Sequence, residues 1–292
     1  MWTIGPKPSR YKYIAIAPTA APKAKLRIPP TSSDPIRHVL APLHQVVATA
    51  RSRAGMGGWA ALAVDLLLPR RCAACEIGLP LGHAHALCVP CRRTLRMPIA
   101  SLCERCGLPI SLPLHLCAAC TARTPTFDTA RALGLYLAGP GVLNPLARAV
   151  RALKFHGHRA VASALGGDLA ALLALPARAL VVPVPLHVSR LRERGYNQAM
   201  LLARALARRA GLRVAPRALV RLRPTPSQAH LDAASRRANL ADAFAATTAL
   251  DTATIVLVDD VLTTGATADA CASALRAAGA AHVLVLTVGR TP

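Results

Sequence analysis

The chain has 292 residues, enough for one large domain and one small one. Its 36 Lys and Arg residues outnumber 13 Asp and Glu residues, and the formal net charge of +23 at pH 7 favours phosphorylated or nucleic-acid partners. No run of about eighteen apolar residues is free of charges and Pro, which argues against membrane insertion, and only 3% of residues are aromatic, so a core must be built from Ala, Leu and Val.

Residues 1–55 differ in composition from the rest of the chain. They contain eight Pro residues and four of the five Lys residues, and the fifth is Lys154. Pro-rich basic segments without hydrophobic periodicity do not build a core, so we expect a disordered extension here. Translation that starts at Met56 is one hypothesis for this change in composition. A basic arm that binds nucleic acid and a targeting peptide are the alternatives.

Residues 56–124 predict a short helix followed by two zinc ribbons. Eight of the nine Cys residues form four C-x-x-C pairs, the spacing of knuckles that give two thiolates each to a tetrahedral Zn²⁺. The pairs are Cys72 and Cys75, Cys88 and Cys91, Cys103 and Cys106, and Cys117 and Cys120. We expect two structural Zn²⁺ ions, with the knuckles paired either sequentially or in a cross-braced manner. A disulfide framework would need an oxidising compartment, and no signal peptide is evident, so we expect a cytoplasmic protein.

Residues 125–292 alternate between strand and helix patterns. The expected strands cover residues 131–137, 179–185, 254–258 and 282–288, and the expected helices cover residues 143–155, 159–175, 198–209 and 266–278. Residues 219–240 are polar and predict a long functional loop. This alternation predicts an α/β domain with a mostly parallel sheet flanked by helices, whose ligands bind beyond the C-terminal strand ends.

Residues 255–267 combine a buried strand, two acids and a turn that begins a helix. Asp259 and Asp260 follow the hydrophobic strand, and the turn offers the hydroxyl groups of Thr263, Thr264 and Thr267. The first N–H groups of a helix are unsatisfied and its dipole is positive there, so the turn predicts an anion site. Carboxylates beside it can accept hydrogen bonds from vicinal hydroxyls. Together these features indicate a ribose 5-phosphate compound as the ligand.

From Cys72 to Arg290 the chain resembles the ComF family of competence-associated, phosphoribosyltransferase-like proteins. The motifs that carry the resemblance are Leu153-Lys154-Phe155, Val182-Pro183-Val184-Pro185-Leu186-His187, Arg190-Leu191-Arg192-Glu193-Arg194-Gly195-Tyr196-Asn197-Gln198, Thr225 with Gln228, Arg236-Arg237 with Asn239, and the stretch at Asp259. This resemblance implies a type I phosphoribosyltransferase fold behind a double zinc ribbon. It also implies a function in natural competence, DNA uptake and nucleoside metabolism.

The resemblance implies a site for 5-phosphoribosyl 1-pyrophosphate (PRPP) with Mg²⁺. Asp259 and Asp260 would hold the ribose hydroxyls, and Arg236 and Arg237 would face the departing pyrophosphate. The 5-phosphate would lie against Thr263, Thr264, Gly265, Ala266 and Thr267. The pyrophosphate would meet backbone N–H groups of the loop Pro183, Val184, Pro185 and Leu186, with Arg190, Arg194 and Lys154 as charged contacts.

Two classes of function stay open at this point. One is a phosphoribosyltransferase whose acceptor no short motif identifies. The other is a non-catalytic accessory protein of DNA uptake that binds PRPP, a nucleotide or single-stranded DNA, with a helicase as a candidate partner. The PRPP loop favours the first class, whereas the ribbons and the basic charge favour the second.

Overall fold

The computed structural model describes residues 70–83, 85–95, 101–111, 114–139, 142–155, 157–223, 240, 242–250 and 253–292. The expected extension at 1–55, the helix at 56–68 and most of the loop at 219–240 lie outside these residues. The described residues belong to one compact unit, Ala50–Pro292. Within the described part of the chain, no helix is long and apolar enough to cross a membrane.

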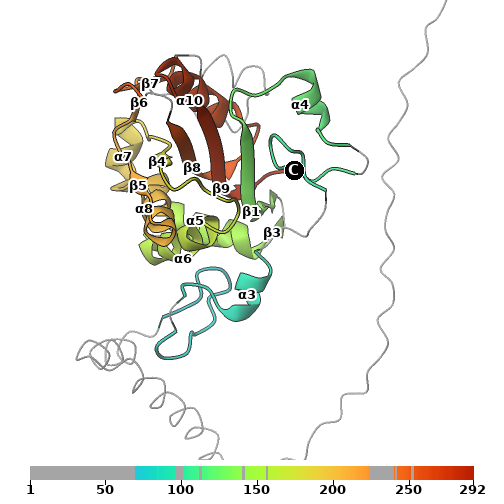
Figure 1. Ribbon diagram of the computed structural model, residues 1–292. Helices are drawn as coiled ribbons and strands as arrows, with labels where there is room; N and C mark the ends of the chain where they lie inside the picture. Colours follow the sequence, from blue (N-terminus) through green and yellow to red (C-terminus); the bar gives the residue numbers. More distant parts are fainter. Residues whose placement is uncertain are drawn as a thin grey trace, which may run out of the picture. The chain divides into compact units, whose positions relative to one another are not determined.

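Five strands form the central sheet in the order β1-β9-β8-β4-β5 (Figure 1). Their bounds are β1 Thr129–Leu135, β4 Leu180–Pro183, β5 Arg213–Val214, β8 Thr254–Leu262 and β9 His282–Arg290. Each neighbouring pair in this sheet is parallel. Near-continuous apolar runs are typical of parallel strands covered on both faces. The predicted α/β class with a parallel sheet is confirmed.

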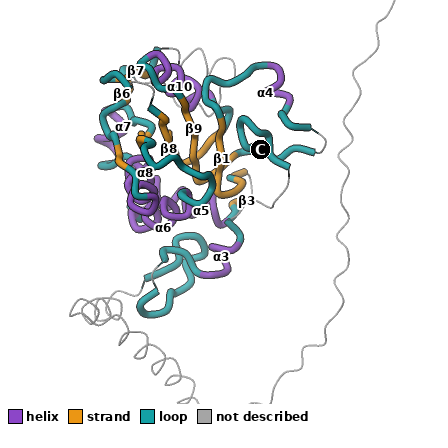
Figure 2. Tube along the Cα trace, viewed as in Figure 1, coloured by secondary structure: helices purple, strands orange, loops and turns teal. Residues whose placement is uncertain are grey.

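Three helices cover one face of the sheet (Figure 2). They are α5 Pro145–Phe155, α6 Arg159–Leu169 and α8 Gln198–Ala210. Their buried residues, among them Leu153 and Leu206, form one apolar cluster with Val256 and Val258 of β8. Consecutive strand residues point to opposite faces, so Val256 and Val258 face these helices while Ile255 and Leu257 face away from them.

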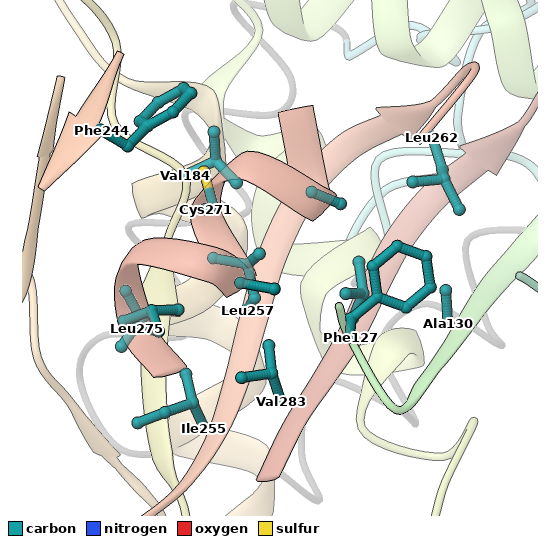
Figure 3. Close-up of a cluster of buried hydrophobic side chains, with 14 of the residues drawn as sticks. Phe127, Ala130, Val184, Phe244, Ile255, Leu257, Leu262, Cys271, Leu275 and Val283 are labelled. Atoms are coloured by element: carbon teal, nitrogen blue, oxygen red, sulfur yellow. The ribbon is translucent and has the colours of Figure 1, made fainter. Parts of the chain in front are cut away.

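Helix α10 Ala266–Ala277 covers the opposite face. Cys271 and Leu275 lie in a second cluster with Ile255 and Leu257 of β8 (Figure 3). Cys271 is fully buried, as expected for a small core residue. An antiparallel pair of short strands, β6 Leu219–Arg221 and β7 Phe244–Ala246, contributes to the same cluster.

The zinc-ribbon segment is built from short helices and isolated bridges that pack on the sheet domain. Its helices are α3 Val89–Arg93 and α4 Ala118–Ala122. The second ribbon joins the cluster under α10, because Cys103, Cys106, Cys117 and Cys120 belong to it. Gly134 of β1 allows the first ribbon to approach closely, since a Cβ there would lie 1.8 Å from the carbonyl oxygen of Leu95.

Several elements differ from the sequence-based expectation. β8 continues to Leu262 rather than ending at Val258, because it pairs with β9 as far as Arg290. Helix α6 ends at Leu169, earlier than the predicted residue 175. The start of the predicted loop 219–240 is strand β6. A helix, α7 Val188–Arg194, was not expected; it buries no residue, so it leaves no apolar stripe in the sequence.

The antiparallel pair β2 Ala138–Gly139 and β3 Val142–Leu143 was also not expected. Two-residue strands are too short to show an alternating pattern.

Candidate functional site

The predicted phosphate loop connects the C-terminal end of β8 to the N-terminus of α10. Gly265 is the N-cap of α10 and has a φ of 83°, a left-handed conformation that glycine adopts without strain. Thr263 and Thr264 are exposed, and the Thr264 hydroxyl accepts a hydrogen bond from the Ala266 N–H at 3.4 Å. Exposed hydroxyls at the start of a helix are the groups on which the predicted anion site depends.

The two adjacent acids emerge on opposite faces of β8, which the sequence did not suggest. Asp260 shares the face of Val256 and Val258, toward α5, and Asp259 shares the face of Ile255 and Leu257, toward α10. The extension of β8 beyond Val258 is the cause, since strand geometry alternates the side chains. The two carboxylates therefore lie in different surroundings and do not act as one pair.

Asp260 is 4% exposed and forms an ion pair with Lys154 of α5. The Lys154 Nζ lies 2.8 Å from Asp260 Oδ1. The other oxygen, Oδ2, is buried and accepts no hydrogen bond from any described residue. Burial acts to lower the pKa of Lys154, but the Asp260 carboxylate, helped by Asp259, outweighs it and raises that pKa above its usual value.

Asp259 is half-buried, and its Oδ1 accepts a hydrogen bond from the Asp260 N–H at 2.8 Å. Burial, followed by repulsion from Asp260, raises the pKa of Asp259 to about 7. Arg221 of β6 and Cys271 of α10 lie on this side. Burial lowers the pKa of Arg221, and burial followed by the Asp259 charge raises the pKa of Cys271 well above its usual value.

The expected pyrophosphate loop follows β4, but it offers fewer N–H donors than the family resemblance implied. Pro183 and Pro185 have no N–H, and the Val184 N–H donates to Val258 O at 2.9 Å. Leu186 is the remaining residue of the four with an N–H to offer. The Asn197 side chain donates to Val184 O at 3.0 Å and fixes this loop against the start of α8.

Two of the three arginines of α7 have partners within the protein. Arg190 lies 3.7 Å from Glu193, and the Arg194 guanidinium donates to Gln198 Oε1 at 2.7 Å. Arg194 also lies over the ring of Phe155, 5.4 Å from its centroid. The Tyr196 hydroxyl donates to the carbonyl oxygen of Leu153. These contacts join the Lys154 end of α5 to the segment between α7 and α8.

Part of the predicted site lies outside the described residues. Arg236 and Arg237 belong to that part, together with Thr225, Gln228 and Asn239. The described portion brings together three separate stretches of sequence: the β8 end with the phosphate loop that follows it, the β4 loop, and Lys154.

The eight paired cysteines form two tetrads that fit zinc. Within each tetrad the four Sγ atoms lie within 4.8 Å of one another, and the Sγ atoms of Cys75 and Cys88, like those of Cys106 and Cys117, are 3.6 Å apart. Four sulfurs at about 2.3 Å from a tetrahedral Zn²⁺ would be about 3.8 Å apart, so the residues suit the ion. The tetrads combine the first two knuckles and the last two, which is the sequential pairing.

Histidines near the tetrads have different surroundings. The side chain of His115 is 82% exposed. The side chain of His85 is 14% exposed, and its Nε2 lies 3.6 Å from Asp168 of α6. Arg92 of α3 contacts the same carboxylate at 2.7 Å. The first ribbon is thus attached to α6 by charged groups.

The sequence did not single out Arg290, at the end of β9. Its guanidinium donates to the carbonyl oxygens of Leu262 at 3.3 Å and Thr263 at 2.6 Å, next to the phosphate loop. It also lies 3.9 Å from Cys106 Sγ. The one signal in the sequence was an arginine at the end of an apolar strand. The partners of that arginine could not be inferred without the fold.

The chain is similar in sequence to a known domain family and to several bacterial proteins. Residues 63–121 match the family model described as a double zinc ribbon domain. The chain is similar to DNA utilization protein YhgH of Salmonella typhi, at 35% identity over 77% of this chain and 99% of that protein. The Escherichia coli K12 protein of the same name is 34% identical over the same shares. Competence protein F of Haemophilus influenzae is 28% identical over 75% of this chain and 96% of that protein.

Among solved structures, the chain is similar to glutamine PRPP amidotransferase from B. subtilis complexed with ADP and GMP. The two are 22% identical with a TM-score of 0.34, and the match covers 48% of this chain and 30% of the amidotransferase chain.

Proposed function

Since the chain belongs to the ComF family of competence and DNA utilization proteins, we propose that it binds PRPP with Mg²⁺ and acts in DNA uptake. The site is the C-terminal edge of the sheet, where the phosphate loop, the β4 loop and Lys154 meet. In parallel sheets, ligands bind beyond the C-terminal strand ends. The basic charge of the chain suits a ligand with several phosphates.

The observation that carries this proposal is the unsatisfied oxygen of Asp260. A buried acceptor without a partner costs free energy, and native proteins seldom leave one. Asp260 Oδ2 has none among the described residues, and it lies on the strand that leads directly into the phosphate loop. A ribose hydroxyl is the donor that would satisfy it when the 5-phosphate occupies the start of α10.

The groups around this oxygen would contact different parts of PRPP. The first N–H groups of α10 and the hydroxyls of Thr263 and Thr264 bind the 5-phosphate. Lys154 holds the Asp260 carboxylate in place and adds a positive charge beside the pyrophosphate. Mg²⁺ would be bound largely through pyrophosphate and ribose oxygens. Because Asp259 faces α10 rather than α5, we assign the main ribose contact to Asp260.

Calorimetric titration with PRPP and Mg²⁺ tests the assignment. We expect Asp260→Asn to weaken PRPP binding by about tenfold or more, because hydrogen bonds to charged groups are worth about 1.5–3 kcal/mol. Asp168→Asn makes the same chemical change on α6, beside the first ribbon, and should bind PRPP like the unmodified protein. Equal affinity of the unmodified protein and Asp260→Asn would remove the ribose contact.

Catalysis is a separate step of the proposal. A phosphoribosyltransferase would consume labelled PRPP in the presence of one acceptor from a panel of purine bases, pyrimidine bases and ammonia. Formation of a labelled ribosyl product would identify the acceptor class. Binding without any turnover across the panel would support the accessory, non-catalytic function instead.

A second candidate function, binding of single-stranded DNA, is favoured by a basic cavity between the first ribbon and α6. Its volume is about 1790 Å³, and its lining includes Arg71, Arg92, Arg159 and Arg209 but, among the described residues, only Asp168 as an acid. None of its described lining residues belongs to the phosphate loop. The two functions would thus use separate surfaces.

Salt dependence tests this second candidate. Binding of single strands through phosphates should weaken steeply as salt rises, because each neutralised phosphate releases counterions. Arg159→Gln and Arg209→Gln should reduce the salt slope, whereas Asp260→Asn should leave it unchanged. A flat salt dependence would contradict phosphate-driven binding at this cavity.

A further inference from the structure

Arg290 connects two parts of the protein that are far apart in the sequence. It ends strand β9 and is 8% exposed. One terminal nitrogen of its guanidinium donates to the carbonyl oxygens of Leu262 and Thr263, and the other lies 3.9 Å from the Sγ of Cys106. Arg290 thereby contacts both the phosphate loop and the second cysteine tetrad.

The charge of Arg290 needs a partner, because an unpaired buried cation is costly. No carboxylate among the described residues lies within 4.0 Å of its guanidinium. The guanidinium does contact Cys106 of the second tetrad, and four thiolates around one Zn²⁺ carry a formal charge of about −2. A guanidinium beside a zinc thiolate is a stabilising outer contact, which orients the ligand and holds the metal.

A second contact joins the same ribbon to the phosphate loop. Arg123, directly after α4, lies 3.0 Å from the Oδ2 of Asp269 in the first turn of α10. The other oxygen of Asp269 accepts a hydrogen bond from the Thr126 N–H at 2.5 Å. Asp269 in turn donates its own N–H to the carbonyl oxygen of Gly265 at 2.8 Å. The loop is thus fixed from the ribbon side at both of its ends.

We propose that the second zinc centre positions the phosphate loop, and that Arg290 is the positioning residue that connects them. The Thr263 carbonyl, held by Arg290, sets where the loop leaves β8. The Asp269 contacts set where α10 begins. The first zinc centre has no such connection among the described residues, since its charged contacts lead to Asp168 on α6. The inference rests on the proposed function only in taking residues 263–267 as the loop that binds PRPP.

Arg131 provides a matched control within the same ribbon. Its guanidinium donates to the carbonyl oxygen of Glu104 at 3.1 Å and lies near that of Cys103, so it holds the ribbon but does not contact the phosphate loop. Arg131→Gln should loosen the ribbon backbone without changing the loop. Arg290→Gln should change both the second zinc centre and the phosphate loop.

The first experiment measures zinc release and hydrogen exchange in the full-length, zinc-loaded protein. We expect Arg290→Gln to release one of its two Zn²⁺ ions to a chelator about tenfold faster than the unmodified protein, because outer contacts of this kind typically change metal affinity by about 10–100-fold. Amides of residues 263–267 should also exchange faster. In Arg131→Gln those amides should exchange at the unmodified rate.

Arg290→Lys is the second variant, for the case in which Arg290→Gln does not fold. Lysine keeps the charge, but its three N–H donors lie on one nitrogen, so it cannot reach the loop carbonyls and the thiolate as the two terminal nitrogens of Arg290 do. Its zinc release should stay slow while its loop amides exchange faster. Unchanged loop exchange in both Arg290 variants would overturn the inference.

PRPP titration separates this inference from the proposed function. If the unmodified protein binds PRPP, Arg290→Gln should weaken that binding by about tenfold, the size expected for a displaced outer contact, and Arg131→Gln should not. If the unmodified protein does not bind PRPP, the proposed function fails, and the zinc-release and exchange results still decide whether Arg290 connects the two parts. Weakened PRPP binding with unchanged loop exchange would refute the positioning role.

Discussion

Asp259 and Asp260 are adjacent in the sequence, yet their carboxylates are in different electrostatic surroundings. Asp260 has a lysine at 2.8 Å, whereas Asp259 faces the layer of α10 and β6 and has its pKa raised to about 7 by burial and by Asp260. Alternation along β8 produces this division of roles. The pKa of Asp259 lies near neutral pH, so the charge beside the Lys154–Asp260 ion pair changes with pH.

We predict that Asp259 lowers stability as the pH rises. Its pKa is about 7 in the folded protein against an ordinary 3.8, so between these values the folded state holds a proton that the unfolded state has lost. The free energy of unfolding should therefore fall as pH rises toward 7 and level off above it. Asp259→Asn should lack this dependence. Urea unfolding at several pH values from about 6 to about 8 gives the free energy of unfolding of the unmodified protein and of Asp259→Asn.

The difference in the free energy of unfolding between the unmodified protein and Asp259→Asn isolates the contribution of Asp259. Zinc ligands also bind protons, but their contribution is common to both proteins and cancels in the difference. A difference that stays constant over this range would contradict the raised pKa.

At the residue scale, local motifs were predictable and long-range partners were not. The C-x-x-C knuckles and the turn at Gly265 were identified because their chemistry is contained in a few adjacent positions. Arg290 was missed because Cys106 is 184 residues away and Thr263 is 27 residues away in the sequence. The partner of Lys154 was missed for the same reason, since Asp260 reaches it only when α5 packs on β8.

At the scale of elements, long apolar segments were predictable and short or exposed ones were not. α5, α8, α10 and β9 follow clear periodic patterns and lie close to their expected bounds. α7 buries no side chain, and β5 has two residues, so neither leaves a pattern in the sequence. β8 was predicted to end at Val258 because two charged residues follow, whereas its pairing with β9 carries it to Leu262.

The start of α8 yields a prediction about the β4 loop. Asn197 caps the helix by accepting hydrogen bonds from Ala199 and Met200, and it also donates to Val184 O. We expect Asn197→Ala to lower the free energy of unfolding by about 0.5–2 kcal/mol, the range for losing a cap. Chemical denaturation gives this value. PRPP affinity should fall as well, because the β4 loop loses its support.

Asn197→Asp distinguishes the cap from the loop contact. Aspartate keeps the oxygen that caps α8 but has no N–H to donate to Val184 O. Stability should stay close to that of the unmodified protein while PRPP binding weakens. Loss of stability equal to that of Asn197→Ala would show that the donation to Val184, rather than the cap, carries the stabilisation.

At the scale of the whole molecule, the two zinc centres differ in burial. All four cysteines of the second tetrad are buried, whereas in the first tetrad Cys75 is exposed and Cys88 is half-buried. We predict that a chelator removes zinc in two phases, and that thiol labelling read by mass spectrometry reaches residues 72–91 before residues 103–120. Simultaneous labelling of both tetrads would contradict this order.

Stability should follow the same order. Loss of the second zinc should lower the melting temperature of the whole unit, because all four of its cysteines belong to the cluster under α10. Loss of the first zinc should lower it less, because only Cys72 and Cys91 of that tetrad are buried in the cluster with α5, α6 and α8. Circular dichroism recorded during chelation checks both steps.

Strand β9 lies between β1 and β8 in the sheet but follows both of them in the chain. On the ribosome, both ribbons and four of the five strands emerge before the strand that joins β1 to the rest. The ribbons make local contacts and can bind zinc early. Until β9 is synthesised, β1 and β8 each have an unpaired edge, and unpaired strand edges favour aggregation. A nonsense mutation near residue 282 would therefore remove an internal strand of the sheet rather than an edge strand, and would leave a zinc-loaded but incomplete protein for the cell to degrade.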